Sequence, residues 1–183
     1  PTVALAAPGD EDSPVKTGEE LKQAVEAAAE EGGDIYVASM KLDQSIEINN
    51  TKGKIRIIGV NNAVLTLGDE NKSRHFVIGA EVAEAIDFRG LTIQGRGIGD
   101  ATETGNPGGG VEAAESYSKT VSFYNCVIDG NVAVMGGGIK APMVYLQNSV
   151  LSGNAAYDSD DVQGIGGGVY ANTIKTANVT VYD

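Results

Sequence analysis

Three carboxylates lie within four residues at Asp158, Asp160 and Asp161, and they are the clearest candidates for metal binding in the sequence. Carboxylate oxygens on a flexible loop suit Ca²⁺, which accepts roughly six to eight oxygen ligands in variable geometry. The spacing does not match an Asp-x-Asp-x-Asp-Gly loop, and no distal Glu completes one. We therefore hypothesise a calcium site at these three residues, with a solvated acidic loop as the alternative, and expect no other cofactor.

Histidine and cysteine each occur once, as His75 and Cys126. Zinc sites and disulfide frameworks need several such residues, so the sequence excludes both within this chain. Lys140 is the one candidate base for lyase chemistry that combines a lysine with a calcium cluster, and an exposed structural lysine is the alternative. We assign no residue as catalytic.

The overall charge argues against two classes of partner. The 183 residues include 25 acidic and 13 basic side chains, which gives a formal net charge of -12. Such a chain repels phosphate backbones and anionic lipid surfaces. No apolar run approaches the roughly 18 residues that a membrane helix requires. We expect no nucleic-acid partner and no direct membrane insertion by this segment.

The N-terminal third of the chain begins with an arm and a helix. Residues 1–16 are rich in proline and acidic side chains, which predicts a flexible arm. Thr17 and Glu20 fit a capping box, and Gly32-Gly33 supplies a helix stop. Between them, apolar residues recur at helical spacing at Leu21, Ala24, Val25 and Ala28. The spacing predicts an amphipathic helix over 18–31 within a capping segment 17–33.

After residue 33 the apolar period falls to two, and a ten-residue unit recurs at 86–95, 121–130 and 144–153. Positions one, three, six and eight of the unit are almost all apolar, so we expect them to share one interior, with Cys126 among them as a buried thiol. Position five is Gly or Asn, residues that tolerate the left-handed backbone of a sharp corner. The asparagines at this position, Asn125 and Asn148, are expected to stack and bond along the coils. Residues 179–183 match the first five positions of the same unit.

Glycine triplets recur in step with that unit and begin at positions 108, 136 and 166. A period near 29 residues with about three short strands per turn predicts an all-β fold, a right-handed parallel β-helix whose coils stack about 4.8 Å apart. The helix would cover the apolar end of the first coil. We therefore expect one domain over 17–183, with coils over 34–183. The C-terminal end lacks such a cover, so we expect truncation there, with further coils or an anchor domain following Asp183.

The outward positions and the loops offer two further hypotheses. Outward side chains are expected at Glu112, Lys140 and Tyr170 beside the triplets, and at Asp87, Ser122 and Tyr145 in the unit. These residues form neither the regular array of like side chains that an ice-binding face needs nor a basic track for a polyanion. Long loops at 96–107 and 154–165 flank a short one at 131–135. We hypothesise a shallow ligand groove over the middle coil, with tolerance of loop length as the alternative. Its borders would be Asp100, Glu103, Tyr157 and Asp158.

The helix followed by Gly-Gly-Asp34-Ile-Tyr-Val-Ala38 resembles the start of pectin-lyase-like right-handed β-helix proteins. The stretch Ile128-Asp-Gly-Asn131, followed by Gly-Gly-Gly-Ile139, resembles the repeat of polymorphic outer-membrane proteins and similar bacterial adhesins, and Leu151 to Asn154 begins a second copy. This chain departs from that repeat in having Ile or Leu for Phe and Gly for Ala. The resemblance implies a secreted or cell-surface bacterial adhesin-type scaffold that binds a glycan or a host surface protein.

Enzymes of the same fold carry catalytic signatures that can be checked in the sequence. Pectate-lyase-like chains have Trp-x-Asp-His and Arg-x-Pro-x-x-Arg blocks, whereas this chain has no Trp and its His lies in Arg74-His75-Phe76. Polygalacturonase-like chains need paired Asp residues, one to donate a proton and one to activate water, with Gly-His-Gly and Arg-x-Lys. None of these blocks occurs. A carbohydrate-active enzyme, lyase or glycosidase, stays the alternative to the adhesin, and a purely structural stalk is a third possibility.

Overall fold

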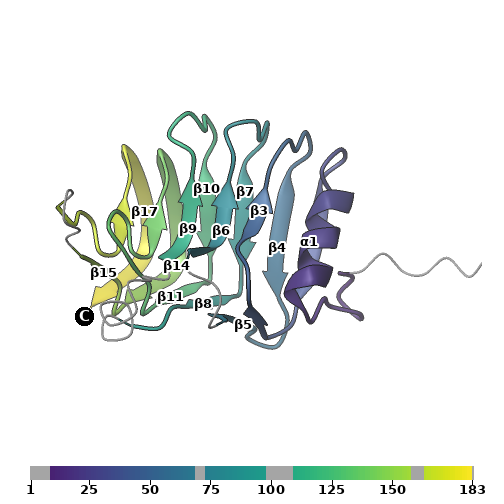
Figure 1. The fold of residues 1–183 in the computed structure, drawn as a ribbon, viewed down its shortest axis with the longest axis horizontal. Helices are drawn as coiled ribbons and strands as arrows, with labels where there is room; N and C mark the ends of the chain where they lie inside the picture. The colour runs from purple at the N-terminus through teal and green to yellow at the C-terminus, as the bar shows by residue number, and fades with distance from the viewer. Residues whose placement is uncertain (1–8, 69–72, 98–108, 158–162, 183) are drawn as a thin grey trace, which may run out of the picture.

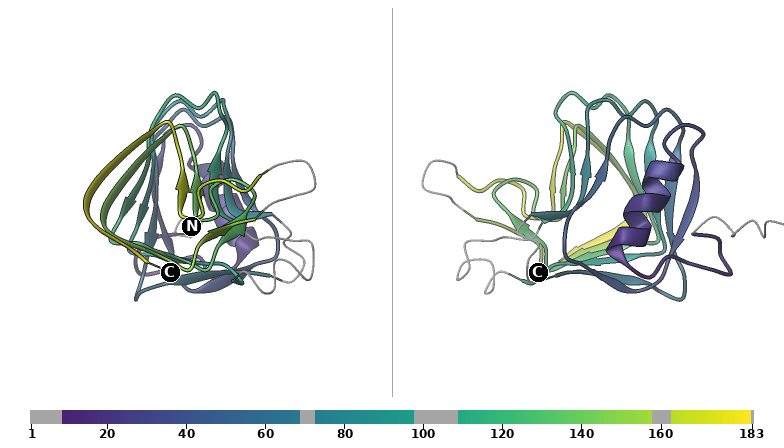
Figure 2. Two further views of the ribbon diagram at one scale, coloured as in Figure 1. Left: turned by 90° about the vertical axis from the view of Figure 1, so that its left-hand side faces the viewer. Right: turned by 45° about the vertical axis from the view of Figure 1, so that its right-hand side comes forward.

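The computed structural model describes residues 9–68, 73–97, 109–157 and 163–182. It is a mostly β, solenoid-like fold in which parallel strands stack along one axis, with one short helix at the N-terminal end (Figure 1). Viewed along that axis, the strands curl around a common interior (Figure 2). The expected all-β class with an N-terminal helix is confirmed at this level.

Helix α1 (Gly18–Ala27) begins where the capping box predicts. The Thr17 hydroxyl accepts from the Glu20 N–H at 3.2 Å, and a Glu20 carboxylate oxygen accepts from the Lys16 N–H at 2.7 Å. The predicted end at residue 31 is wrong, because residues 28–31 form turns rather than helix. Acidic side chains there oppose the negative C-terminal end of the helix dipole, and α1 has no basic residue in its last turn to offset them.

The strands form three groups, and every pairing between named strands is parallel. A ten-stranded sheet contains β1 (Gly33–Val37), β2 (Met40–Leu42), β4 (Ile55–Gly59), β5 (Val64–Leu67), β7 (Ile86–Arg89), β8 (Thr92–Gln94), β10 (Val121–Tyr124), β11 (Val127–Asp129), β14 (Met143–Ser152) and β17 (Thr173–Tyr182). A five-stranded sheet contains β3 (Ile46–Ile48), β6 (Arg74–Ile78), β9 (Gly109–Ala113), β13 (Ile139–Lys140) and β16 (Val169–Tyr170). The third group pairs β12 (Val132–Ala133) with β15 (Ala155–Ala156).

The ten-residue units stack in register, and their predicted interior positions are buried. Ile86, Val121 and Val144 lie side by side at position one, and the same holds for the other interior positions. Cys126 is buried as expected. The alignment predicted for residues 179–183 is wrong, because Val144 pairs with Ile174, so a fourth unit begins five residues earlier. The corner residue Asn178 sets this register.

The corner position adopts the left-handed backbone that the sequence predicts. Its φ is 61° at Gly90, 53° at Asn125, 49° at Asn148 and 54° at Asn178. Stacked corners also bond to each other, since the Asn178 side-chain amide donates to the Asn148 side-chain oxygen at 2.9 Å. This bond joins Asn148 to Asn178, which the prediction did not include, and the bond expected between Asn125 and Asn148 stays a prediction.

A second pair of asparagines, Asn131 and Asn154, forms hydrogen bonds to the backbone from inside the fold. The fully buried Asn131 side chain donates to the Ile93 carbonyl at 2.9 Å and to the Asn154 side-chain oxygen at 3.1 Å. Asn154 in turn donates to the Ile128 carbonyl at 2.6 Å. Buried carbonyls need such partners, which gives this motif asparagine a structural role.

Gly137 and Gly138 of the second glycine triplet lie where successive coils approach too closely for a side chain. Gly137 donates to the Gly166 carbonyl at 3.2 Å, and Gly138 donates to the Gly167 carbonyl at 2.9 Å. A Cβ atom built on Gly137 would lie 2.2 Å from the Ala155 carbonyl oxygen. Only glycine fits such a contact.

The interior is a continuous apolar column with an aromatic centre. Phe88 packs edge-on against Phe76 at 4.9 Å between ring centroids and stacks on Phe123 at 5.1 Å. In the described part of the chain, no helix has the length and hydropathy to cross a membrane.

Candidate functional site

Most of the residues predicted to bind ligand lie outside the described residues. This holds for the calcium hypothesis at Asp158, Asp160 and Asp161, and for Asp100, Glu103 and Asp158 of the groove. Tyr157 is described and half-buried, and its N–H donates to the Ala133 carbonyl at 3.2 Å. Elsewhere, the described residues contain no group of three or more metal-binding side chains. The calcium and groove hypotheses stay predictions.

Three of the residues predicted to point outward form a row across the five-stranded sheet. Glu112, Lys140 and Tyr170 occupy matching positions of β9, β13 and β16. The Lys140 ammonium lies 2.8 Å from a Glu112 carboxylate oxygen, and only 17% of its side chain is exposed. The interpretation of Lys140 as an exposed lysine is therefore wrong: strand stacking covers its stem and places its charge against a carboxylate.

Arg74 anchors this row from the preceding coil. Its Nε donates to the second Glu112 carboxylate oxygen at 2.8 Å, and its terminal nitrogens donate to the Gly136 and Met135 carbonyls at 2.8 and 2.7 Å. Gly109 leaves room for this side chain, because a Cβ there would meet the guanidinium at 2.6 Å. The sequence offered no signal for these contacts, which join Arg74 to the next coil at Glu112 and to the coil after it at Met135 and Gly136.

The electrostatics of the row favour an ionised carboxylate. Burial alone would raise the pKa of Glu112, but the hydrogen bond from Lys140 and the charges of Arg74 and Lys140 outweigh it and hold that pKa below its ordinary value. Burial lowers the pKa of Arg74, with Glu112 opposing the shift. Glu112 is thus the fixed negative centre between two cations.

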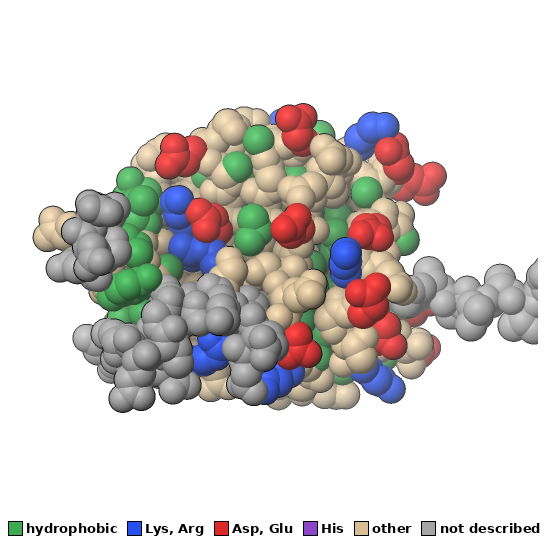
Figure 3. All heavy atoms as spheres, viewed as in Figure 1, with side chains coloured by type: hydrophobic (Ala, Val, Ile, Leu, Met, Phe, Trp, Pro, Cys, Tyr) green, Lys and Arg blue, Asp and Glu red, His purple; other side chains and the backbone are tan. Residues whose placement is uncertain are grey.

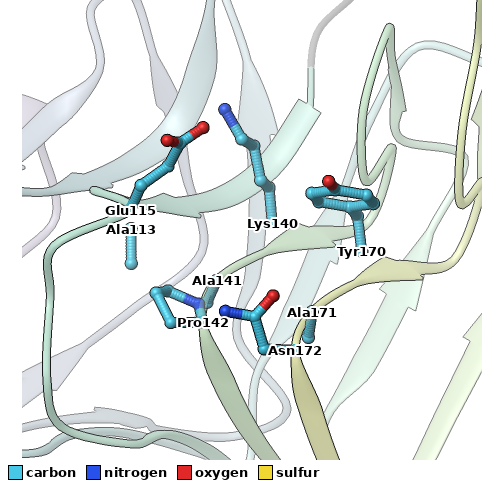
Figure 4. A pocket seen from close by; sticks show the side chains of 8 residues that line it. All are labelled: Ala113, Glu115, Lys140, Ala141, Pro142, Tyr170, Ala171 and Asn172. Carbon is cyan, nitrogen blue, oxygen red and sulfur yellow. The ribbon is translucent and has the colours of Figure 1, made fainter.

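A pocket of about 320 Å³ opens beside this row (Figure 4). Lys140 and the Tyr170 ring point the same way at its upper rim, and Asn172 and Pro142 lie below them (Figure 4). Tyr170 is 39% exposed, although it lies on a paired strand. The lining residues are Ala113, Glu115, Lys140, Ala141, Pro142, Tyr170, Ala171 and Asn172.

The lining residues of this pocket decide which kinds of group it can contact. It presents an aromatic ring, an amide, an ammonium and a carboxylate, a set that can bind a polar ring by stacking and hydrogen bonding. Glycoside hydrolysis uses a pair of carboxyl groups, whereas Glu115 is the one carboxylate among the described lining residues. The Lys140 side chain donates to Glu112 at 2.8 Å, so Glu112 fixes its position at the pocket rim.

The single histidine and cysteine have structural environments. His75 is fully buried, and its ring nitrogens lie 3.1 Å from the Gly109, Leu65 and Gln94 carbonyl oxygens. Burial lowers the pKa of His75 to about 4, so the ring is neutral at pH 7. Burial raises the pKa of Cys126 to about 11, which removes the thiolate that nucleophilic chemistry requires.

Two other predicted outward positions are covered. Asp87 is 1% exposed because Lys54 and Arg89 fold over its carboxylate, with nitrogen–oxygen distances of 3.0 and 2.9 Å. Ser122, its neighbour in register, is buried as well. Tyr145 is half-buried on the next strand.

Comparison of the chain with family models, curated proteins and solved structures finds no match. The resemblances to pectin-lyase-like and surface-repeat proteins therefore rest on the residues quoted for them.

Proposed function

We propose that this chain is a right-handed parallel β-helix of the pectin-lyase-like type that serves as an adhesin-type binding scaffold, secreted or displayed on a bacterial cell surface. Its ligand is a glycan or a surface protein. The stacked register, the left-handed corners and the helix over the first coil support the architecture.

The observation that carries the binding role is the Tyr170 ring, exposed beside Lys140 at the rim of the pocket. A rigid parallel ladder holds both residues, so a ligand meets a preorganised surface and little ordering entropy is lost on binding. Exposed aromatic rings next to hydrogen-bonding groups are typical of recognition surfaces.

Binding to a glycan array by the wild-type chain and by Tyr170→Ala tests the proposal. We expect the substitution to weaken binding to the retained glycans at least tenfold, because it removes the stacking surface. Tyr36→Ala is the matched control, since Tyr36 is a half-buried tyrosine of β1 at the other end of the solenoid. Equal binding by wild type and Tyr170→Ala would contradict the assignment of the pocket.

A second assay on the same protein distinguishes the binding role from the enzyme alternative. We expect no formation of unsaturated products or reducing ends from uronate polymers, with or without added Ca²⁺. Turnover at catalytic rates would replace the binding role by a lyase or hydrolase role.

A further inference from the structure

A second surface with recognition chemistry lies on the ten-stranded sheet, away from the pocket. Arg89, Tyr124, Tyr145 and Lys175 form it, and we name these four residues the tyrosine stripe. Arg89 pairs in register with Tyr124 on β10, and Tyr145 on β14 pairs with Lys175 on β17. The stripe therefore crosses four neighbouring strands.

The two tyrosines form its centre. Their ring centroids lie 5.6 Å apart with the planes tilted by 60°, and both residues are half-buried. The Arg89 guanidinium carbon lies 4.6 Å from the centroid of the Tyr124 ring, a cation–π contact. At the other end, Lys175 is exposed next to Tyr145.

The carboxylates on this face are already neutralised. Asp87 contacts both Arg89 and Lys54, and Asp34 on β1 contacts Arg56 at 2.8 Å. Strands β10, β14 and β17 carry no acidic residue at all. In a chain of net charge -12, the stripe therefore combines two half-buried tyrosine rings with the partly exposed Arg89 and the exposed Lys175, and the Asp87 and Asp34 carboxylates on this face are ion-paired.

We propose that the tyrosine stripe binds a short acidic glycan. Sugar rings place their apolar faces against the tyrosines, and their carboxylate or sulfate groups contact Arg89 and Lys175. Three strand spacings of about 4.8 Å separate the two cations, so the ligand spans roughly 14 Å and contains several sugars. The net negative charge of the chain repels long, densely charged polyanions such as nucleic acids, whereas an oligosaccharide with charges spaced by neutral rings meets less repulsion.

Calorimetry with matched oligosaccharides tests this inference. The probes are a hexasaccharide of alternating glucuronate and N-acetylglucosamine, its sulfated counterpart, and the same hexasaccharide with its carboxylates methyl-esterified. We expect the wild-type chain to bind at least one acidic probe at least tenfold more tightly than the ester. Raising the salt from 50 to 500 mM should weaken that binding several-fold.

Variants locate the binding on the stripe. Tyr145→Ala and Lys175→Gln should each weaken binding to the acidic probe about fivefold or more, with thermal unfolding confirming that both variants fold. Tyr36→Ala and Lys22→Gln are the controls, because they remove a tyrosine and a lysine outside the stripe.

Three results would overturn the inference: no binding of either acidic probe, equal affinity for the acid and its ester, or unchanged binding by the stripe variants. Loss of binding in Tyr170→Ala alone would place the acidic glycan in the pocket instead. Because the stripe and the pocket use different residues on different sheets, failure of one assignment is distinguishable from failure of the other.

Discussion

Apolar side chains are buried at the N-terminal end of the solenoid and exposed at its C-terminal end. At the N-terminal end, α1 packs over the first coil, and Ile35 on β1 is 3% exposed. At the C-terminal end, Ile174 on β17 is 47% exposed and Val181 is 68% exposed. Figure 3 shows hydrophobic side chains gathered at that end, on its left-hand side, while acidic and basic side chains mix over the remaining surface.

The position of a residue in the repeat and its burial have separate causes. Val144 and Ile174 are register partners at position one of their units, yet only Val144 is buried. The repeat directs both side chains to the interior, but a neighbouring layer must exclude water from them. Leu21, Ala24 and Val25 supply that layer at the N-terminal end, and no described residue supplies it beyond β17.

The largest effect should come from removing a side chain that seals the covered end. We expect Leu21→Ala to lower the free energy of unfolding by about 2–5 kcal/mol, because the fully buried side chain leaves a cavity. Ile174→Ala, the matched substitution at the open end, should lower it by only about 0.5 kcal/mol. Urea denaturation measures both values, and similar losses would refute the contrast between the ends.

The second prediction concerns pH, because the covered interior holds a titratable ring. The pKa of His75 is about 4 in the folded chain against 6.5 for an ordinary histidine. Above pH 6.5 both states are neutral; as the pH falls from 6.5 towards 4, only the unfolded chain takes up the proton, so stability decreases. The loss is about 3 kcal/mol over that range.

Denaturation of wild type and His75→Gln at several pH values measures how much stability His75 removes as the pH falls. The variant should be less stable at pH 7 but lose less stability between pH 6.5 and 4. Glu112 acts separately, because its lowered pKa removes stability only as the pH falls below its ordinary value of 4.5. Parallel pH curves for the two proteins would argue against a neutral buried His75.

A smaller effect is expected from the start of the covering helix. Thr17→Ala removes the hydroxyl that accepts from the Glu20 N–H, which should cost about 1 kcal/mol of stability. Thr173→Ala, an exposed threonine on β17, should change stability by no more than about 0.5 kcal/mol. Chemical denaturation of the pair measures the difference, and a loss in Thr173→Ala as large as in Thr17→Ala would contradict it.

The smallest effect is association through the open end. Exposed apolar side chains on an edge strand favour pairing between chains, so we expect weak, concentration-dependent self-association of this chain. Val181→Lys should shift sedimentation towards the monomer, whereas Gln23→Lys on α1 should not. A strictly monomeric wild-type chain at high concentration would contradict this prediction.

The coil pattern was predictable from the sequence, whereas the contacts around Glu112 were predictable only in part. The bends between strands were predictable from the corner residues Gly90, Asn125 and Asn148, because backbone conformation at those positions depends on local residue type. The glycine triplets likewise indicated where strands stack. The fourth unit begins at Ile174 rather than at Val179, with Asn178 at its corner. Of the functional residues, the stacking of Glu112 on Lys140 followed from the period, but the contacts of Arg74 with Glu112 and Gly136 did not.

Local residue types are enough to predict which side chains of the repeated unit point inward, where the chain turns, and where the helix begins. Those properties follow from the alternation of strands, the left-handed tolerance of Gly and Asn, and the capping residues at Thr17 and Glu20. The stacking of the coils is what covers Lys140 and Asp87, leaves Ile174 exposed, and brings Tyr124 beside Tyr145. Burial and ion pairing depend on which coil stacks next, and that information is spread over residues about 30 positions apart.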